Sequence, residues 1–362
     1  MQNEGVADSY PSTGNRSIGP SKTCNTLKHH LPIALLCLTL LALAIASLLC
    51  GSVPVPKDEA LRILLHGSDP DHRAWSHIIW EMRVPQTLTA IFTGASLATS
   101  GLLLQTLFRN PLAGPSILGI DSGANLGVAV VMLLMGGTMT LGGMSVAGYL
   151  LVILAAMAGA TLVMLLLISF SMRIRSHVML LITGVMISYI AGSIISLLNY
   201  SASAQGVQAY IVWGMGNFSS VSSGRLPLFI CLCTLWLLAA ILHIKPLNAL
   251  LLGEQYATNL GYDIRPLRTR LLLITGLLTA TTTAFCGPIS FLGLAVPHLA
   301  RLTTGTSNHR LLLPTTLLTG SCLALTCSLL SNLPANGTII PINVITPCIG
   351  APVVLWIILR RG

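Results

Sequence analysis

Long apolar blocks that contain almost no charge are the feature that most constrains how this chain folds. Ten blocks occur, at about 31–51, 85–108, 115–135, 146–170, 178–200, 226–244, 268–286, 287–300, 311–331 and 340–359. A membrane-spanning helix needs about 20 predominantly apolar residues. Charged residues are 8% of the chain and mean hydropathy is +0.81, whereas a soluble domain is about a quarter charged. The sequence therefore predicts an all-α membrane protein with about ten transmembrane helices, in which residues 31–362 form one domain covered by membrane lipid.

The distribution of basic residues predicts the orientation of the chain. If residues 1–30, a polar segment that we expect to be a disordered tail, are cytoplasmic and each block crosses once, 14 of the 19 Lys and Arg residues lie inside. Basic residues concentrate on the cytoplasmic side of membrane proteins, so both termini are predicted to be cytoplasmic. The net charge of +9 is scattered between the blocks. It therefore predicts no nucleic-acid partner, which would require a basic stripe.

One cytoplasmic segment, 245–270, is long enough to bind a partner. It predicts two short helices, 247–252 and 254–260, with Gly253 between them and Gly261 as a C-cap. A compact, charged helical hairpin on the inner face is typical of a docking element.

Two blocks open with a Gly-Pro pair, at Gly114-Pro115 and Gly287-Pro288, and a Leu-Gly pair follows each. The two blocks are five crossings apart, so two halves repeated with that period would be inverted. Interrupted segments at matching places in inverted halves point to a transport pathway near the repeat interface. Gly-Pro pairs are also ordinary helix breakers, and the pattern alone does not choose between these two interpretations.

Small residues recur every fourth position in block 178–200, at Gly184, Ser188, Gly192 and Ser196. Such a stripe lets two helices approach closely, and close packing is the favoured interpretation. A wall facing a bulky cargo is the alternative, and the two agree if the stripe lies at a subunit interface.

Isolated polar residues give weaker signals. Asp121 lies just inside an apolar block, where an intramembrane carboxylate is functional by default, but a cap at the start of a helix is favoured. His298 has no second His, Cys or carboxylate at metal-ligand spacing, which favours a structural hydrogen bond. The sequence contains no GxxxxGK[ST] phosphate loop, so another polypeptide must hydrolyse any ATP that drives transport. We expect no catalytic residue, metal or cofactor in this chain.

Several motifs together resemble those of the FecCD-type permeases for iron-siderophores, haem and vitamin B12, from about residue 31 to the C-terminus. The matching stretches are Arg83-Val84-Pro85, Gly94-Ala95-Ser96-Leu97-Ala98-Thr99-Ser100-Gly101, Leu107-Phe108-Arg109-Asn110-Pro111-Leu112-Ala113, Leu118-Gly119-Ile120-Asp121-Ser122-Gly123-Ala124, Leu252-Gly253-Glu254, Leu260-Gly261, the run Gly287 to Arg301, and Ile349-Gly350-Ala351-Pro352.

The resemblance implies the membrane subunit of a type II ABC importer in a bacterial inner membrane. It implies a homodimer of ten-helix subunits, two cytoplasmic ATPase subunits and a periplasmic substrate-binding protein. It assigns ATPase coupling to Leu252, Gly253, Glu254, Leu260 and Gly261. It places the helix that carries Gly184, Ser188, Gly192 and Ser196 along the translocation pathway, to which we also assign Asp121 and Pro288. It assigns docking of the binding protein to Arg83, with Lys57 and Arg62 on the same face as further candidates.

Three departures from the family pattern occur. Gln86 stands where many members have a second arginine, Asp121 stands where Ser or Asn is usual, and the segment 339–343 reads Ile-Ile-Pro-Ile-Asn where Glu-Leu-Pro-Val-Gly is typical. A secondary transporter or channel is the alternative function, although it would normally carry ionisable coupling groups at mid-membrane. The sequence does not distinguish a ferric siderophore, haem or cobalamin as the cargo.

Overall fold

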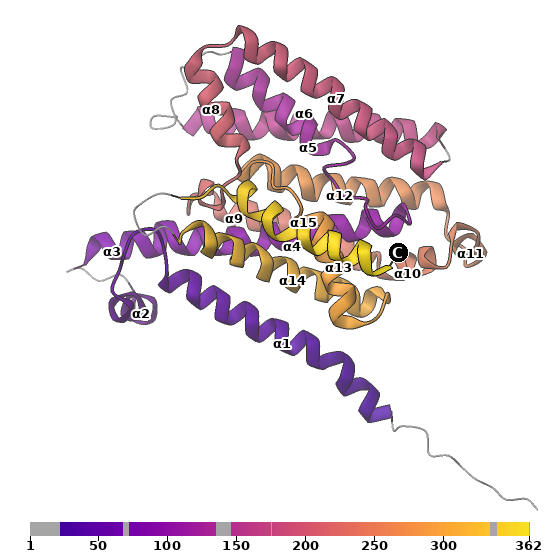
Figure 1. Ribbon diagram of the computed structural model, residues 1–362, viewed down its shortest axis with the longest axis horizontal. Coiled ribbons are helices and arrows are strands. Elements are labelled where there is room, and N and C mark those ends of the chain that lie inside the picture. The colour runs from indigo at the N-terminus through magenta and orange to yellow at the C-terminus, as the bar shows by residue number, and fades with distance from the viewer. Residues whose placement is uncertain (1–21, 68–71, 135–145, 175, 334–338, 362) are drawn as a thin grey trace, which may run out of the picture.

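The computed structural model describes residues 22–67, 72–134, 146–174, 176–333 and 339–361, and all regular structure among them is helical (Figure 1). The elements are α1 (Lys22–Leu49), α2 (Lys57–His66), α3 (Arg73–His77), the π-helix η1 (Ile78–Arg83), α4 (Val84–Leu107), α5 (Ile120–Ala129), the π-helix η2 (Val130–Leu134), α6 (Val146–Arg173), α7 (His177–Ser201), α8 (Ala204–Gly214), the 3-10 helix η3 (Phe218–Ser220), α9 (Leu226–Leu242), α10 (Ile244–Leu251), α11 (Glu254–Asn259), α12 (Ile264–Cys286), α13 (Leu292–Thr304), α14 (His309–Ser331) and α15 (Ile342–Arg361).

Each of the ten apolar blocks coincides with a helix, which confirms the all-α membrane class. Among the described residues, six helical segments are long and apolar enough to span a membrane, and α9 with α10, bent by 51°, makes a seventh if the pair is counted as one span. The three remaining blocks form the shorter helices α5 with η2, α13 and α15. Two of these three follow the Gly-Pro pairs, which explains why they are short.

The first helix differs from the expected boundary. It begins at Lys22 instead of Leu31, so the last part of the expected disordered tail is helical. The rest of the tail, residues 1–21, lies outside the described residues.

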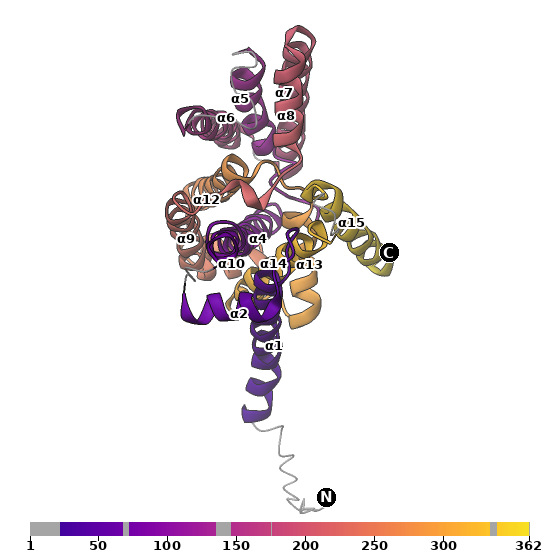
Figure 2. The same cartoon turned by 90° about the vertical axis from the view of Figure 1, so that its left-hand side faces the viewer.

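Helix α4 forms the centre of the subunit because its small residues let neighbouring backbones approach. Every residue from Thr93 to Phe108 is buried. A Cβ at Gly94 would lie 2.2 Å from the carbonyl oxygen of Gly320 on α14, and one at Gly101 would lie 1.7 Å from that of Gly293 on α13. Small residues at such crossings replace side-chain contact with close backbone contact. Helices α12, α13, α14 and α9 accordingly pack around α4 (Figure 2).

Helix packing repeats between the two halves of the chain. Helix α4 packs on α14 as α12 packs on α6, and α4 on α13 as α12 on α5. Helix α5 likewise packs on α6 and α7 as α13 packs on α14 and α15. Each of these contacts has a matching contact between the two helices that lie five apolar blocks away in the chain. This is the pattern expected if the two halves are repeats. Helices α5, α6 and α7 form a layer that stands apart from the α4 bundle, with α12 between them (Figure 1).

Candidate translocation pathway and coupling hairpin

The segment around 245–270 contains the predicted helical hairpin, which we call the coupling hairpin (residues 244–261). It consists of α10 and α11, joined at Gly253, whose φ is +116°. Gly261 follows α11 with φ +89°, and its N–H donates to the carbonyl of Thr258 over 2.9 Å. Only glycine adopts such dihedrals without strain. The two glycines predicted to shape the hairpin therefore sit where its backbone requires them.

The coupling hairpin presents apolar side chains to water. Leu252 is 64% exposed, Leu260 56% and Tyr256 48%. Ala257 of α11 is completely buried and belongs to the main apolar core, which holds the helix against the bundle. Single exposed apolar side chains are ordinary on a protein surface, but three within nine residues of one short hairpin suit docking of another subunit.

Glu254 ties the second hairpin helix to the membrane domain. Its carboxylate lies 2.8 Å from the guanidinium of Arg268, a buried residue of α12. A second nitrogen of the same guanidinium lies 3.5 Å from the carbonyl oxygen of Ile174, just after α6. An open cavity of about 450 Å³ lies beside this ion pair, with Arg265 in its wall.

The small-residue stripe of α7 has two parts with different surroundings. Gly184 and Ser188 pack inside the subunit, where a Cβ at Gly119 would lie 2.7 Å from the Ser188 hydroxyl oxygen and 2.8 Å from the Gly184 carbonyl oxygen. Gly192 and Ser196 are exposed, and a Cβ at Gly192 would meet no atom within 4 Å. Half of the stripe is thus a packing seam, as favoured from the sequence. The other half is free in the single subunit.

The exposed face of α7 is apolar and carries no charged side chain. Its exposed large residues are Val178, Met179, Ile182, Met186, Tyr189, Ile190, Ile194, Leu197 and Tyr200. The hydroxyls of Ser188 and Ser196 donate to the carbonyls four residues earlier. The face therefore offers a smooth, weakly polar wall.

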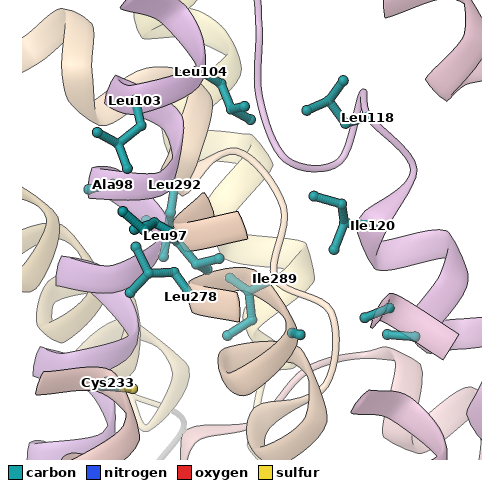
Figure 3. Close-up of a cluster of buried hydrophobic side chains, with 14 of the residues drawn as sticks. Leu97, Ala98, Leu103, Leu104, Leu118, Ile120, Cys233, Leu278, Ile289 and Leu292 are labelled. Atoms are coloured by element: carbon teal, nitrogen blue, oxygen red, sulfur yellow. The ribbon is translucent and has the colours of Figure 1, made fainter. Parts of the chain in front are cut away.

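The two Gly-Pro segments meet in space. A Cβ at Gly293 would lie 3.0 Å from the Pro115 ring, and both segments line one cavity of about 220 Å³. Figure 3 shows Leu118 and Ile120 of one segment, and Ile289 and Leu292 of the other, among the buried apolar side chains. Pro288 is half-buried in the second segment, and Phe291 adopts a φ of +68°. Backbone strain of this kind clusters at functional sites.

Asp121 lies in the first turn of α5 but does not cap that helix. Gly119 occupies the N-cap position. The Asp121 carboxylate is buried and accepts hydrogen bonds from Ser116 (2.7 Å) and from Thr283 of α12 (3.0 Å). The favoured cap interpretation is therefore wrong, because the side chain points across to α12 instead of back along its own helix. This link places Asp121 between the two layers.

The three candidates for binding-protein docking have different surroundings. Arg83 is 4% exposed, and its guanidinium donates to the carbonyls of Leu48 and Leu49, each over 2.9 Å, and of Val53 over 2.7 Å. Arg83 therefore has a structural role, because it donates hydrogen bonds to carbonyl groups at the end of α1 and just after it. Lys57 is exposed at the start of α2, and Arg62 of the same helix pairs with Glu59 over 3.6 Å. Docking by any of the three stays a prediction.

Asn343 is a connecting residue whose role the sequence did not reveal. Its side-chain amide donates to the carbonyls of Pro288 (2.6 Å) and Gly214 (3.1 Å), and its side-chain oxygen accepts from the N–H of Ser290 (3.0 Å). The one indication in the sequence was the departure from the family pattern at 339–343, because members of the family usually have glycine at the position of Asn343. That asparagine joins the second Gly-Pro segment to the end of α8.

His298 makes the hydrogen bond expected for a structural residue. Its Nε2 lies 2.8 Å from the carbonyl oxygen of Pro111. Among the described residues, no group of three or more His, Cys, Asp or Glu side chains is arranged to hold a metal ion.

These features define a multi-helix membrane subunit with an exposed apolar face on α7 and an exposed helical hairpin formed by α10 and α11. The FecCD transport family model matches residues 38–360, and the chain belongs to this family. It is a multi-pass membrane permease subunit of a bacterial ABC importer, in which a separate subunit hydrolyses ATP.

Curated relatives and a solved structure agree with this assignment. The chain is 36% identical over 285 residues to the vitamin B12 import system permease protein BtuC of Klebsiella pneumoniae, covering 78% of this chain and 83% of the relative. It is 34% identical over 286 residues to BtuC of Escherichia coli, covering 78% and 84%. A solved structure described as an inward-facing, metal-chelate type ABC transporter matches with a TM-score of 0.77 and 30% identity, over 91% of this chain and 98% of that one.

Proposed function

We propose that two copies of this chain form the transmembrane channel of a binding-protein-dependent importer that carries a bulky metal chelate across the bacterial inner membrane. The cargo class is a corrinoid or a ferric chelate, either haem or a ferric siderophore. Two cytoplasmic ATPase subunits drive transport, a periplasmic binding protein delivers the cargo, and the chain itself carries no cofactor. Both termini are cytoplasmic.

The observation that carries the proposal is the coupling hairpin. A hairpin held by a buried alanine and an ion pair, with Leu252, Tyr256 and Leu260 exposed, offers an ATPase a firm apolar seat. Because basic residues favour the cytoplasmic side, this seat faces the compartment that contains ATP.

The α7 face supports both the dimer and the cargo class. Gly192 and Ser196 leave room beside a helix surface that would otherwise face lipid. Two such faces across a symmetry axis would enclose a path with few directional polar groups. A large chelate that arrives on a binding protein fits such a path, and the names of the BtuC relatives and of the metal-chelate transporter indicate the same class of cargo.

Asp121 argues against a secondary transporter. Transporters that relay protons place ionisable side chains along a pathway, where many of them face a water-filled cavity. The Asp121 carboxylate is instead buried and held by two hydroxyl groups within one subunit.

Reconstitution tests the proposal. The chain, with the ATPase and binding protein encoded nearest its gene, is placed in proteoliposomes, and cyanocobalamin, haem and a ferric hydroxamate are offered in parallel. We expect ATP-dependent uptake of one of the three, abolished when the binding protein is left out. Uptake driven by an ion gradient without ATP would overturn the proposal.

A further inference from the structure

The first helix of the coupling hairpin, α10, packs on α4 and α14 with Leu247 and Leu250 buried, and the side chain of Asn248 also joins it to the bundle by hydrogen bonds. The side-chain oxygen of Asn248 accepts from the backbone N–H of His309 (2.8 Å) and lies 3.0 Å from Nδ1 of the same histidine. Its amide nitrogen donates to the side-chain oxygen of Asn308 over 3.0 Å. The backbone N–H can only donate, which fixes the oxygen of Asn248 toward His309. Nδ1 must then carry a proton and donate as well.

His309 extends this attachment to the centre of the subunit. It is fully buried as the first residue of α14, and its Nε2 lies 2.9 Å from the hydroxyl oxygen of Thr106 near the end of α4. One imidazole therefore joins α10, α14 and α4. Helices α4 and α14 in turn lie in close backbone contact at Gly94 and Gly320.

The second hairpin helix is attached to a different part of the molecule. Glu254 pairs with Arg268 on α12, and Arg268 also approaches Ile174 after α6. Gly253 lies between the two attachments with a φ of +116°. A displacement applied to the exposed face of the hairpin is thus divided between the α4–α14 pair and the α12–α6 side.

We propose that Asn248 is a positioning residue for transport, which passes ATPase movement from α10 to the α4–α14 pair through His309. The inference rests on the proposed function, because it assumes that an ATPase sits on the hairpin. Asn248 touches neither cargo nor nucleotide in this scheme. Its effect is on how much uptake each hydrolysed ATP produces.

Two substitutions at Asn248 separate coupling from folding. Asn248→Leu keeps the approximate size but removes both hydrogen bonds to His309. Asn248→Asp keeps an oxygen that accepts them, replaces the donation to Asn308 by an acceptor and adds a negative charge. Asn332→Leu is the matched control, because Asn332 follows the other end of α14 and its side chain makes no hydrogen bond to any residue that the structure describes.

The measurement is uptake per ATP hydrolysed in proteoliposomes offered cyanocobalamin, haem and a ferric hydroxamate, together with ATPase affinity and thermal stability. Coupling free energies between sites typically correspond to 5–150-fold effects, so we expect Asn248→Leu to lower the ratio about 5-fold or more. We expect Asn248→Asp and Asn332→Leu to keep most of it. ATPase affinity should stay unchanged in all three variants.

The outcomes separate this inference from the proposed function. If wild type shows no ATP-dependent uptake, the proposed function fails. If wild type transports and Asn248→Leu has the same ratio, or if only ATPase affinity or stability falls, Asn248 is structural and the inference is overturned. If Asn248→Leu does not assemble, Thr106→Val replaces it in the test, because this substitution removes the hydroxyl beside His309. We then expect Thr106→Val to lower the uptake per ATP hydrolysed. An unchanged uptake per ATP in Thr106→Val would also overturn the inference.

Discussion

Replacing Gly261 with valine tests whether the shape of the coupling hairpin matters for transport. Gly261 has a φ of +89°, and a Cβ placed there meets no atom within 4 Å. The substitution therefore creates no clash, and its whole cost is backbone strain. A non-glycine residue held in such a sparsely populated region costs about 1–3 kcal/mol, and a β-branched residue adapts worst.

The strain acts on two hydrogen bonds that close α11. They run from Gly261 N–H to the Thr258 carbonyl (2.9 Å) and from Tyr262 N–H to the Ala257 carbonyl (3.1 Å). Relaxing φ to a negative value breaks this cap and shifts Leu260, one of the exposed apolar residues. About 1–3 kcal/mol corresponds to a change of about 5–150-fold in the population of the native cap. The buried bundle is untouched, so insertion into the membrane should be normal.

The assay compares ATP hydrolysis and uptake in the same proteoliposomes. We expect the transporter with Gly261→Val to hydrolyse ATP, but its cargo uptake per ATP should fall about 5-fold or more. Gly224→Val is the control, because Gly224 is exposed in an outer turn, has an ordinary φ and also meets no atom within 4 Å. Equal uptake per ATP by Gly261→Val and Gly224→Val would refute the reasoning.

A cysteine in place of exposed Arg265 should react with an impermeant maleimide only from the cytoplasm, and one in place of exposed Ser219 only from outside; the reverse result would invert the chain. Gly192→Leu meets no atom of its own subunit, so folding should be normal while dimerisation or uptake falls, and normal uptake by a normal dimer would exclude this position from both roles. Arg83→Glu sets a carboxylate against three carbonyl oxygens and should lower the free energy of unfolding in SDS titration by about 3–5 kcal/mol, Arg83→Lys by about 1–3 kcal/mol; equal stability would contradict the buried role. Asn343→Gly removes three side-chain hydrogen bonds and should raise amide hydrogen exchange at its partner Ser290, where unchanged exchange would show that the connection is dispensable.

Local features of the fold could be predicted from the sequence. The ten apolar blocks coincide with helices because burial in lipid selects long apolar runs, whatever their neighbours. The hairpin glycines could be predicted because their signal is also local. A helix end that needs a positive φ favours glycine at that one position, whatever lies around it. Gly253 and Gly261 both have such dihedrals.

Features that depend on distant segments could not be predicted. The four-residue spacing of the α7 stripe does not say that the loop at Gly119 covers Gly184 and leaves Gly192 open. The Arg83 motif does not say that the chain after α1 turns its carbonyls toward the guanidinium. Asp121 was assigned a local cap, yet its second partner, Thr283, is 162 positions away in the chain. In each case the deciding contact comes from a segment outside the helix that carries the residue.

The position of α13 indicates how movement at the inner face can reach the outer face. Near its C-terminal end, Arg301 donates to the Gln105 side chain of α4 over 2.7 Å, and the amide of Gln105 donates to the Leu294 carbonyl over 3.2 Å. Just before its other end, the Pro288 carbonyl accepts from Asn343, which also holds the Gly214 carbonyl.

Helix α13 is therefore fastened at one end to the helix that His309 joins to the coupling hairpin, and at the other to the turn after α8. Contact alone does not establish coupling, since a transmitting element must have two arrangements that both sites bias. The second Gly-Pro segment is suited to this, because Phe291 has a positive φ there and the segment lies against the first Gly-Pro segment across a cavity instead of a packed core. Any shift of α13 would also have to move Gly293 against Gly101 of α4, where the two backbones lie in close contact.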